Sequence, residues 1–275
     1  MKKLLTSFLL LAFASHLFSQ EENNLKNFRF GLLAIPSVNW YKPDDVKKFE
    51  KNGSKLGFGW GMQMEFRLNS LISLTTGLQV NYDRGNLKFT DTTNYFYDTK
   101  NQVIVEPKDT GSIASLACYK LNSRYYKTTY VVLPLYLKMK TKQIGAMTYF
   151  GQFGINTSIK LKSKVTDNVT EYNNYRTPAA GMRAPSDLTD LDMSDDMNIL
   201  KFGLHIGGGA EYNISGSTSL FFGLSYNLGF SNVLKKNSKY LEHWAYSANP
   251  LNNVEGQKTQ IAVGNNFAFT IGILF

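Results

Sequence analysis

Residues Leu56–Leu68 read LGFGWGMQMEFRL, and their alternation decides the fold. Large apolar side chains occupy every second position, from Leu56 to Leu68, and small or polar residues occupy the positions between them. Side chains of a strand point alternately to its two faces, whereas a helix would spread both kinds around its circumference. Thirteen residues are many for a soluble strand, and a tilted strand crosses a bilayer with roughly nine to eleven. The stretch therefore predicts a membrane-spanning strand; the alternative is a β-sandwich strand with an apolar core face.

The same alternation recurs in seven further segments. The links after the second, fourth and sixth strands are short. Those after the odd-numbered strands are long and polar, and one of them, the polar segment 84–127, has room for a small hairpin of its own. Outer-membrane barrels sort their connections in this way, with short periplasmic turns and long extracellular loops. We therefore predict an all-β fold, an eight-stranded antiparallel up-and-down transmembrane β-barrel with long extracellular loops and both termini in the periplasm. The seven segments are Phe28–Tyr41, Leu71–Asp83, Thr128–Lys140, Met147–Lys164, Asn198–Asn213, Ser219–Ser231 and Thr259–Phe275.

The N-terminal residues 1–20 have the pattern of a secretory signal peptide. Lys2 and Lys3 precede an apolar segment from Leu4 to about Ala14, which is too short to span a membrane. Cleavage after Ala14 and cleavage after Ser19 both fit the sequence. The predicted organisation is a signal peptide at 1–20 followed by a barrel domain at 21–275, in the cell outer membrane.

Charge is unevenly distributed among the predicted loops. Residues 165–197 carry seven acidic and two basic residues, whereas the other three long loops are net basic. The acidic cluster between Asp187 and Asp196 suits a solvated loop, packing against the basic loops, or calcium, although its spacing is not that of an EF-hand. The basic loops suit lipopolysaccharide phosphates. We expect outer-membrane lipid and lipopolysaccharide as partners, and no nucleic acid, because the chain is exported.

Six charged residues are predicted to lie on the lumen face near the periplasmic end. Unpaired charges in such a place would be costly, so we expect Glu65 and Glu211 to bridge to Arg29, Arg67 or Lys138 as a polar plug. The bases outnumber the acids, so water or an anion would complete the network. An eight-stranded barrel leaves room for little besides side chains, and the plug predicts a barrel closed to solutes. The six residues are Arg29, Glu65, Arg67, Lys138, Lys140 and Glu211.

The sequence offers little for catalysis. His205 is the one histidine on a predicted lumen face, and an enzyme would pair it with Ser225 or an inward acid. We interpret it instead as a hydrogen-bonded lumen residue, and we predict no catalytic residues, no cofactor and no metal site. Cys118 is the only cysteine, which excludes an intramolecular disulfide, and it falls in a predicted polar connection.

Three short motifs resemble the PorT-type family of bacterial outer-membrane β-barrels. Residues 130–138, YVVLPLYLK, are similar to its fourth strand, of the form Tyr-Leu-Glu-Ile-Pro-Leu-Leu-Leu-Lys. Residues 202–212, FGLHIGGGAEY, resemble its glycine-rich sixth strand, and residues 224–233, LSYNLGFSNV, its seventh. Val132 stands where that family has an acid, which removes any role of that carboxylate.

The resemblance implies a function as well as a fold. The namesake of the PorT-type family is required for type IX protein secretion. We therefore expect a non-enzymatic barrel that supports protein secretion or envelope and surface assembly, with envelope or secretion-system proteins as partners. A narrow pore, a surface adhesin and a barrel-embedded enzyme are the alternatives.

Overall fold

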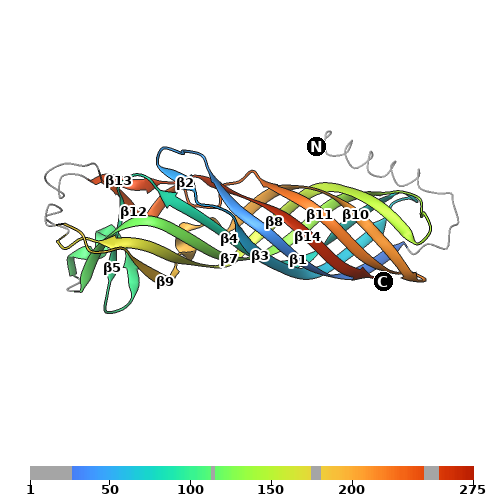
Figure 1. Cartoon of the computed structure of the whole chain (residues 1–275), viewed down its shortest axis with the longest axis horizontal. Coiled ribbons are helices and arrows are strands. Elements are labelled where there is room, and N and C mark those ends of the chain that lie inside the picture. The colour runs from blue at the N-terminus through green and yellow to red at the C-terminus, as the bar shows by residue number, and fades with distance from the viewer. Residues whose placement is uncertain (1–26, 113–114, 175–180, 245–253) are drawn as a thin grey trace, which may run out of the picture.

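Eight strands of the described chain close into a ring. The computed structural model describes residues 27–112, 115–174, 181–244 and 254–275, and the predicted signal peptide lies outside them. Each strand of the ring pairs antiparallel with its neighbours along the chain, and the last pairs with the first. The predicted barrel is therefore confirmed (Figure 1). Its strands are β1 (Phe28–Pro43), β3 (Lys55–Arg67), β4 (Ile72–Phe89), β7 (Leu116–Lys140), β8 (Met147–Glu171), β10 (Leu200–Ser215), β11 (Thr218–Gly229) and β14 (Ala262–Leu274).

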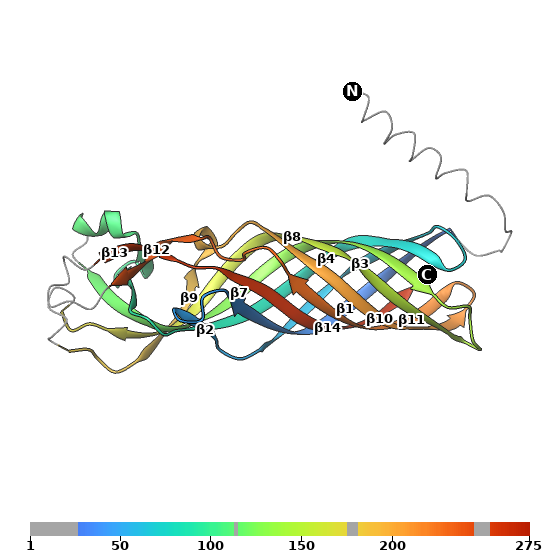
Figure 2. The same ribbon diagram turned by 90° about the horizontal axis from the view of Figure 1, so that it is seen from above.

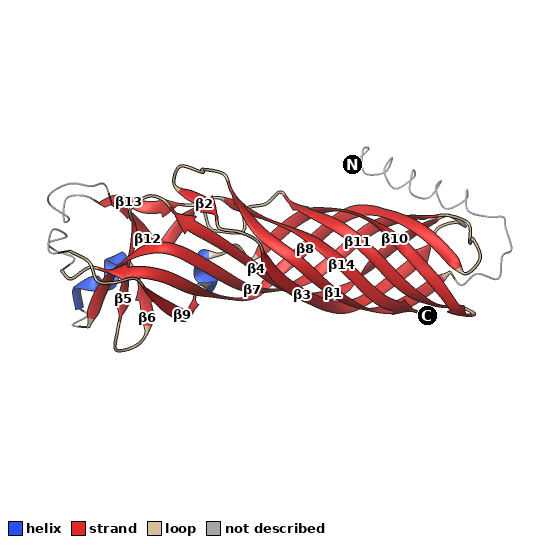
Figure 3. Cartoon of the chain, viewed as in Figure 1, coloured by secondary structure: helices blue, strands red, loops and turns tan. Residues whose placement is uncertain are grey.

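Both described chain ends lie at the end of the barrel that carries the short turns (Figure 1). We call it the short-turn end. At the opposite, long-loop end the sheet continues beyond the ring, as the view turned by 90° shows (Figure 2). Strands dominate throughout, and the short helices lie toward the long-loop end (Figure 3). The elements outside the ring are β2 (Phe49–Lys51), β5 (Thr93–Asp98), β6 (Val103–Val105), β9 (Ser186–Asp192), β12 (Asn237–Trp244), β13 (Val254–Thr259), η2 (Pro107–Ser112) and η4 (Ser194–Asp196).

The described parts of the polar segments 84–127 and 165–197 contain strand extensions that were predicted as connections, which is a correction. The small hairpin allowed for 84–127 is present as β5 and β6. β4, β7 and β8 run well past the predicted strand ends, and β5 pairs with β7 while β9 pairs with β8. In these extensions the alternation reverses, because Leu121, Val165 and Val169 point inward and are fully buried while polar residues face outward. A strand is expected to make this change where it leaves lipid for water. The strand ends were predicted from outward apolar residues, and these stop where the apolar belt ends. The polar extensions of the same strands were therefore missed.

The outer face of the ring carries a continuous apolar belt. Leu56, Phe58, Trp60 and Met62 of β3 are exposed, whereas the alternating Gly59, Gly61, Gln63 and Glu65 are buried. The facing predicted from the quoted stretch is therefore the observed one. Position 61 requires glycine for a steric reason, because a Cβ there would collide with the carbonyl oxygen of Leu78 on β4. Among the described residues, no helix has the length and apolar character needed to cross a membrane.

Pro36 and Pro134 each interrupt one ladder of the ring without shifting its register. The β1–β14 pairing passes from Ala34 and Ile271 to Ser37 and Ala268, leaving out two pairs. The β4–β7 ladder has the same gap beside Pro134. Proline has no N–H to donate to a ladder, which accounts for both gaps. On their other sides both prolines stay in register with β3 and β8.

Candidate functional site

A network of buried ion pairs crosses the lumen at the short-turn end. Arg29 donates to Glu65 at 2.9 Å and to Glu211 at 2.7 Å, and Lys138 contacts Glu65 at 3.1 Å. Lys138 also pairs with Glu211, and Lys140 pairs with both acids. All five side chains are at most 10% exposed. We call them the charge cluster: Arg29, Glu65, Lys138, Lys140 and Glu211.

Arg67 is the predicted site residue that the structure does not bring into this network. Its Nη1 atom is buried without a hydrogen-bond partner among the described residues, and no ion pair joins it to either acid. Its guanidinium would add a fourth positive charge beside two carboxylates. The geometry thus brings together five of the six predicted residues, while solute closure remains a prediction.

Two aromatic rings cover the inner side of the charge cluster. Phe150 and Phe221 stack with centroids 4.8 Å apart. The Lys138 ammonium lies 4.4 Å from the Phe150 centroid and 4.8 Å from that of Phe221. The negative ring faces attract a cation, most strongly where water is excluded. The Lys138 side of the cluster is therefore bordered by two aromatic side chains.

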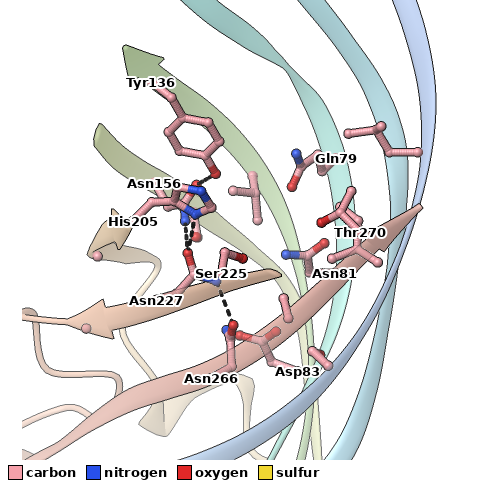
Figure 4. A pocket seen from close by; sticks show the side chains of 18 of the residues that line it. Gln79, Asn81, Asp83, Tyr136, Asn156, His205, Ser225, Asn227, Asn266 and Thr270 are labelled. Carbon is pink, nitrogen blue, oxygen red and sulfur yellow. Dashed lines mark hydrogen bonds between the residues drawn. The ribbon is translucent and has the colours of Figure 1, made fainter. Parts of the chain in front are cut away.

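Beyond these rings lies a small polar cavity (Figure 4). Its volume is about 50 Å³, which is enough for a few water molecules. A hydrogen-bonded series runs along one wall, from Gln152 to His205 (2.8 Å), Asn227 (2.7 Å) and Asn266 (2.7 Å). Each of the four comes from a different strand, so the series ties β8, β10, β11 and β14 together.

His205 uses both ring nitrogens within this series. Nε2 meets the Gln152 amide and Nδ1 meets Asn227 Oδ1, and the ring stacks on Tyr136 with centroids 3.9 Å apart. A general base needs a free nitrogen within hydrogen-bond reach of its nucleophile. Ser225 also lines the cavity, but no hydrogen bond joins its side chain to His205 in the described structure. The arrangement suits a structural histidine.

Sequence reasoning missed the ion pair at the other edge of the cavity. Lys201 of β10 pairs with Asp83 of β4, and its ammonium lies 4.8 Å from the Tyr130 ring centroid. Both residues are expected on lumen faces from the alternation. The alternation therefore places both charges inside the barrel. It does not show that they pair with each other, because β4 and β10 are not neighbours in the ring.

The long-loop end is filled by an apolar core above the ring. Tyr41, Leu121, Tyr126, Val165 and Leu241 pack there with side chains at most 2% exposed. Arg124 and Asp167 form a fully buried bidentate ion pair beside this core, and both N–O distances are 2.7 Å. Burial lowers the pKa of Arg124, but the charge and hydrogen bonds of Asp167 outweigh it and hold that pKa above its ordinary value. Both ends of the lumen are therefore occupied by side chains.

Cys118 lies within β7 and is buried, which corrects its prediction as part of a polar connection. It belongs to a small cluster with Phe96, Val105 and Tyr172. Burial raises the pKa of its thiol, and the nearby Glu242 carboxylate raises it further. A protonated, buried thiol is poorly reactive, so the residue acts in packing.

The family of the chain follows from a match over most of its length. Residues 18–235 match the family described as "Outer membrane protein beta-barrel domain". The chain belongs to this family. It is thus an outer-membrane β-barrel protein, and its short turns face the periplasm while its long loops face outward. This match does not extend to membership of the narrower PorT-type family.

Several solved outer-membrane proteins are similar in fold. Neisserial surface protein A is 11% identical with a TM-score of 0.34, covering 92% of this chain and 98% of that one. Ail of Yersinia pestis is 9% identical with a TM-score of 0.31, covering 91% and 100%. AlkL is 7% identical with a TM-score of 0.38, covering 94% and 93%. Such likeness concerns the fold alone, and no curated protein sequence matches the chain.

The acidic cluster of this outer-membrane barrel is tied into its extracellular part. Asp196 is buried and accepts hydrogen bonds from Ser238, from the backbone N–H of Lys239 (2.6 Å) and from Gln260 (3.1 Å). Asp195 pairs with the Lys239 ammonium at 2.9 Å. Asp195 and Asp196 thus pack against the described part of the basic segment 232–258, whereas Asp187, Asp190 and Asp192 are exposed, as a solvated loop requires.

Proposed function

We propose that this outer-membrane barrel is non-enzymatic and supports protein secretion or surface assembly, with envelope or secretion-system proteins as partners. The observation that carries the proposal is the filling of the lumen from both ends. The charge cluster occupies the periplasmic end, and the core around Tyr41 and Tyr126 occupies the extracellular end. A barrel with such an interior acts through its surfaces. The PorT-type resemblance makes type IX secretion the first system to examine.

The extracellular face is the stronger candidate for partner binding. The periplasmic side of the described chain presents short turns, whereas β5, β6, β9, β12 and β13 extend the sheet outward. Ion pairs hold these pieces together, among them Lys239 with both Glu106 and Asp195. An ordered extension of this kind also favours a second candidate function, a surface adhesin, which needs an exposed and stable binding face. The hydrogen bonds of His205 argue against a barrel-embedded enzyme.

Deletion of the gene tests the proposal. We expect loss of secreted or surface-anchored proteins from the medium and cell surface, restored by the wild-type gene. Outer-membrane permeability to small solutes should stay unchanged, because the lumen is filled. Normal secretion with loss of adhesion to host or matrix material would favour the adhesin. Normal secretion together with reduced solute uptake would overturn the proposal in favour of a pore.

A further inference from the structure

Three basic residues stand side by side on the outer face of the barrel. Arg84 of β4 is the direct cross-strand partner of Lys127 on β7, and Lys127 is the direct partner of Lys164 on β8. All three belong to the outward set, because the residues alternating with them, such as Asp83, Thr128 and Ser163, are buried. Like charges directly opposite each other on a sheet are destabilising. We call Arg84, Lys127 and Lys164 the basic row.

The neighbouring acids compensate this row only in part. Asp190 lies 3.7 Å from Lys127 and 4.0 Å from Lys164, and its carboxylate is 62% exposed. Asp192 is opposite Lys164 across the β8–β9 ladder, but its Oδ1 accepts a hydrogen bond from the Ser194 backbone. Both acids lie at the β8–β9 side of the row. Arg84 contacts a backbone carbonyl, that of Asp83, at 3.0 Å.

Two further lysines add to the positive charge around the row. The ammonium groups of Lys55 and Lys127 lie 5.5 and 5.8 Å from the centroid of the Tyr125 ring. Lys162 is exposed on β8, two residues from Lys164. Five cations thus gather near two carboxylates. A surface with this excess attracts an anion.

The height of the basic row identifies the class of anion. On all three strands the outward residues change from apolar to polar just below it, where Val80, Val131 and Ile159 mark the upper part of the apolar belt. The outward position next below Arg84 is Tyr82, which is paired with the exposed Phe58 of β3. This step of two residues is about 7 Å along the strand and about 5 Å of height at a typical barrel tilt. A headgroup layer is about 5–8 Å thick on each side of the hydrocarbon. The row therefore lies at the level of lipid phosphates.

We propose that the basic row binds a phosphate group of a lipid in the outer leaflet, of the lipopolysaccharide type. Arg84 supplies a planar fork that matches two phosphate oxygens, and Lys127 and Lys164 supply point charges beside it. The acyl chains of the same lipid would lie on the apolar belt directly below. Binding also removes the repulsion along the row, so the lipid stabilises the fold. The inference is independent of the secretion role.

Purified full-length protein in nanodiscs tests this site. Nanodiscs containing phosphorylated lipid A are compared with nanodiscs containing the same lipid A after phosphate removal, and thermal unfolding is followed in each. Wild-type protein should unfold at a higher temperature with phosphorylated lipid A. The triple variant R84Q/K127Q/K164Q should lose that difference. In titrations monitored by native mass spectrometry its affinity for phosphorylated lipid A should fall on the order of a hundredfold.

A charge-matched control separates this site from general attraction. The variant K47Q/K100Q/K142Q removes three exposed lysines elsewhere and should keep the wild-type preference. In a non-ionic detergent the row variant should be at least as stable as wild type, since its like-charge repulsion is gone, which also shows that it folds. An unchanged lipid preference in the row variant would overturn the proposal. Equal loss in the control variant, or full displacement of lipid A by low-millimolar inorganic phosphate, would also overturn it.

Discussion

Arg29 and Glu211 form an ion pair of 2.7 Å across the lumen, although their strands, β1 and β10, are not neighbours in the ring. Contacts between adjacent strands follow from the ladder, but this pair bridges the interior. With Glu65 and the two lysines it fills the periplasmic end of the barrel. The filling of this end therefore depends on side chains that meet only when the ring is complete.

Replacing Glu211 by Gln should destabilise the folded barrel strongly. The substitution leaves Arg29, Lys138 and Lys140 buried with one carboxylate among them. Breaking a buried ion pair in this way costs about 3–5 kcal/mol. Urea titration in lipid vesicles measures the change in the free energy of unfolding. Glu171→Gln, which removes a partner of the exposed Arg183, is the matched control and should change stability by less than about 1 kcal/mol. Equal losses in both variants would contradict the network.

Leu224→Arg should impair folding into lipid much more than Ser225→Asn. Leu224 is 67% exposed on the outer face near the middle of β11, whereas Ser225 lines the lumen cavity. An arginine at the lipid-facing midplane costs about 2–4 kcal/mol. The yield of heat-resistant barrel in vesicles reports the difference. Similar yields for the two variants would show that the assigned faces are wrong.

Asp167→Asn should loosen the extracellular extension without opening the barrel. Arg124 would remain buried and charged beside a neutral partner, which costs about 3–5 kcal/mol locally. Hydrogen exchange should accelerate over residues 116–127 and 165–171, while residues 130–138 keep their protection. Asp109→Asn, at an exposed position, is the control. Protection lost evenly over both regions would mean that extension and barrel unfold as one unit.

Acidification should weaken the ion pairs that Lys239 makes with Glu106 and Asp195. Its hydrogen bonds lower the pKa of Glu106 and of Asp195, and they raise the pKa of Lys239. Carboxylates with lowered pKa stabilise above their unfolded pKa, about 4, and lose this contribution as the pH falls through the folded value. Lysine with a raised pKa stabilises below about pH 10 and loses its contribution as the pH rises further.

The hydrogen-exchange protection of β12, measured over a range of pH, reports how strongly these ion pairs order the strand. After correction for intrinsic rates, protection should be highest between about pH 5 and pH 10 and should fall below pH 4. Lys239→Gln should remove the dependence. A flat profile in wild-type protein, or the same profile in the variant, would show that the contacts do not order β12.

The alternation of side chains was sufficient to predict the membrane part of this fold. In β3 the exposed set around Trp60 and the buried set around Gln63 are those expected from the sequence. The extensions of β7 and β8 were not predicted, because Leu121 and Val165 point inward where the polar and apolar faces exchange. Periodicity indicates two faces, but the solvent outside decides which face is apolar.

The candidate site was predictable to a similar extent. The positions of Glu65 and Glu211 on inward faces near one end bring them close to the same cations, whichever strands lie between. Individual partners are not specified by such a pattern, and so Arg67 was included although the structure does not pair it. The Asp83–Lys201 pair joins strands that are not neighbours, so only the closed ring defines it. The Gln152–His205–Asn227 series joins neighbouring strands and depends on their register.

Closure of the lumen is the central claim, and ion conductance tests it most directly. Purified protein is inserted into planar lipid bilayers, and single-channel current is recorded in molar potassium chloride, with a known porin as the positive control. We predict no stable unitary conductance for wild-type protein, because the charge cluster and the extracellular core fill both ends. A stable, reproducible single-channel conductance of the folded wild-type barrel would contradict the account and would identify the protein as a pore.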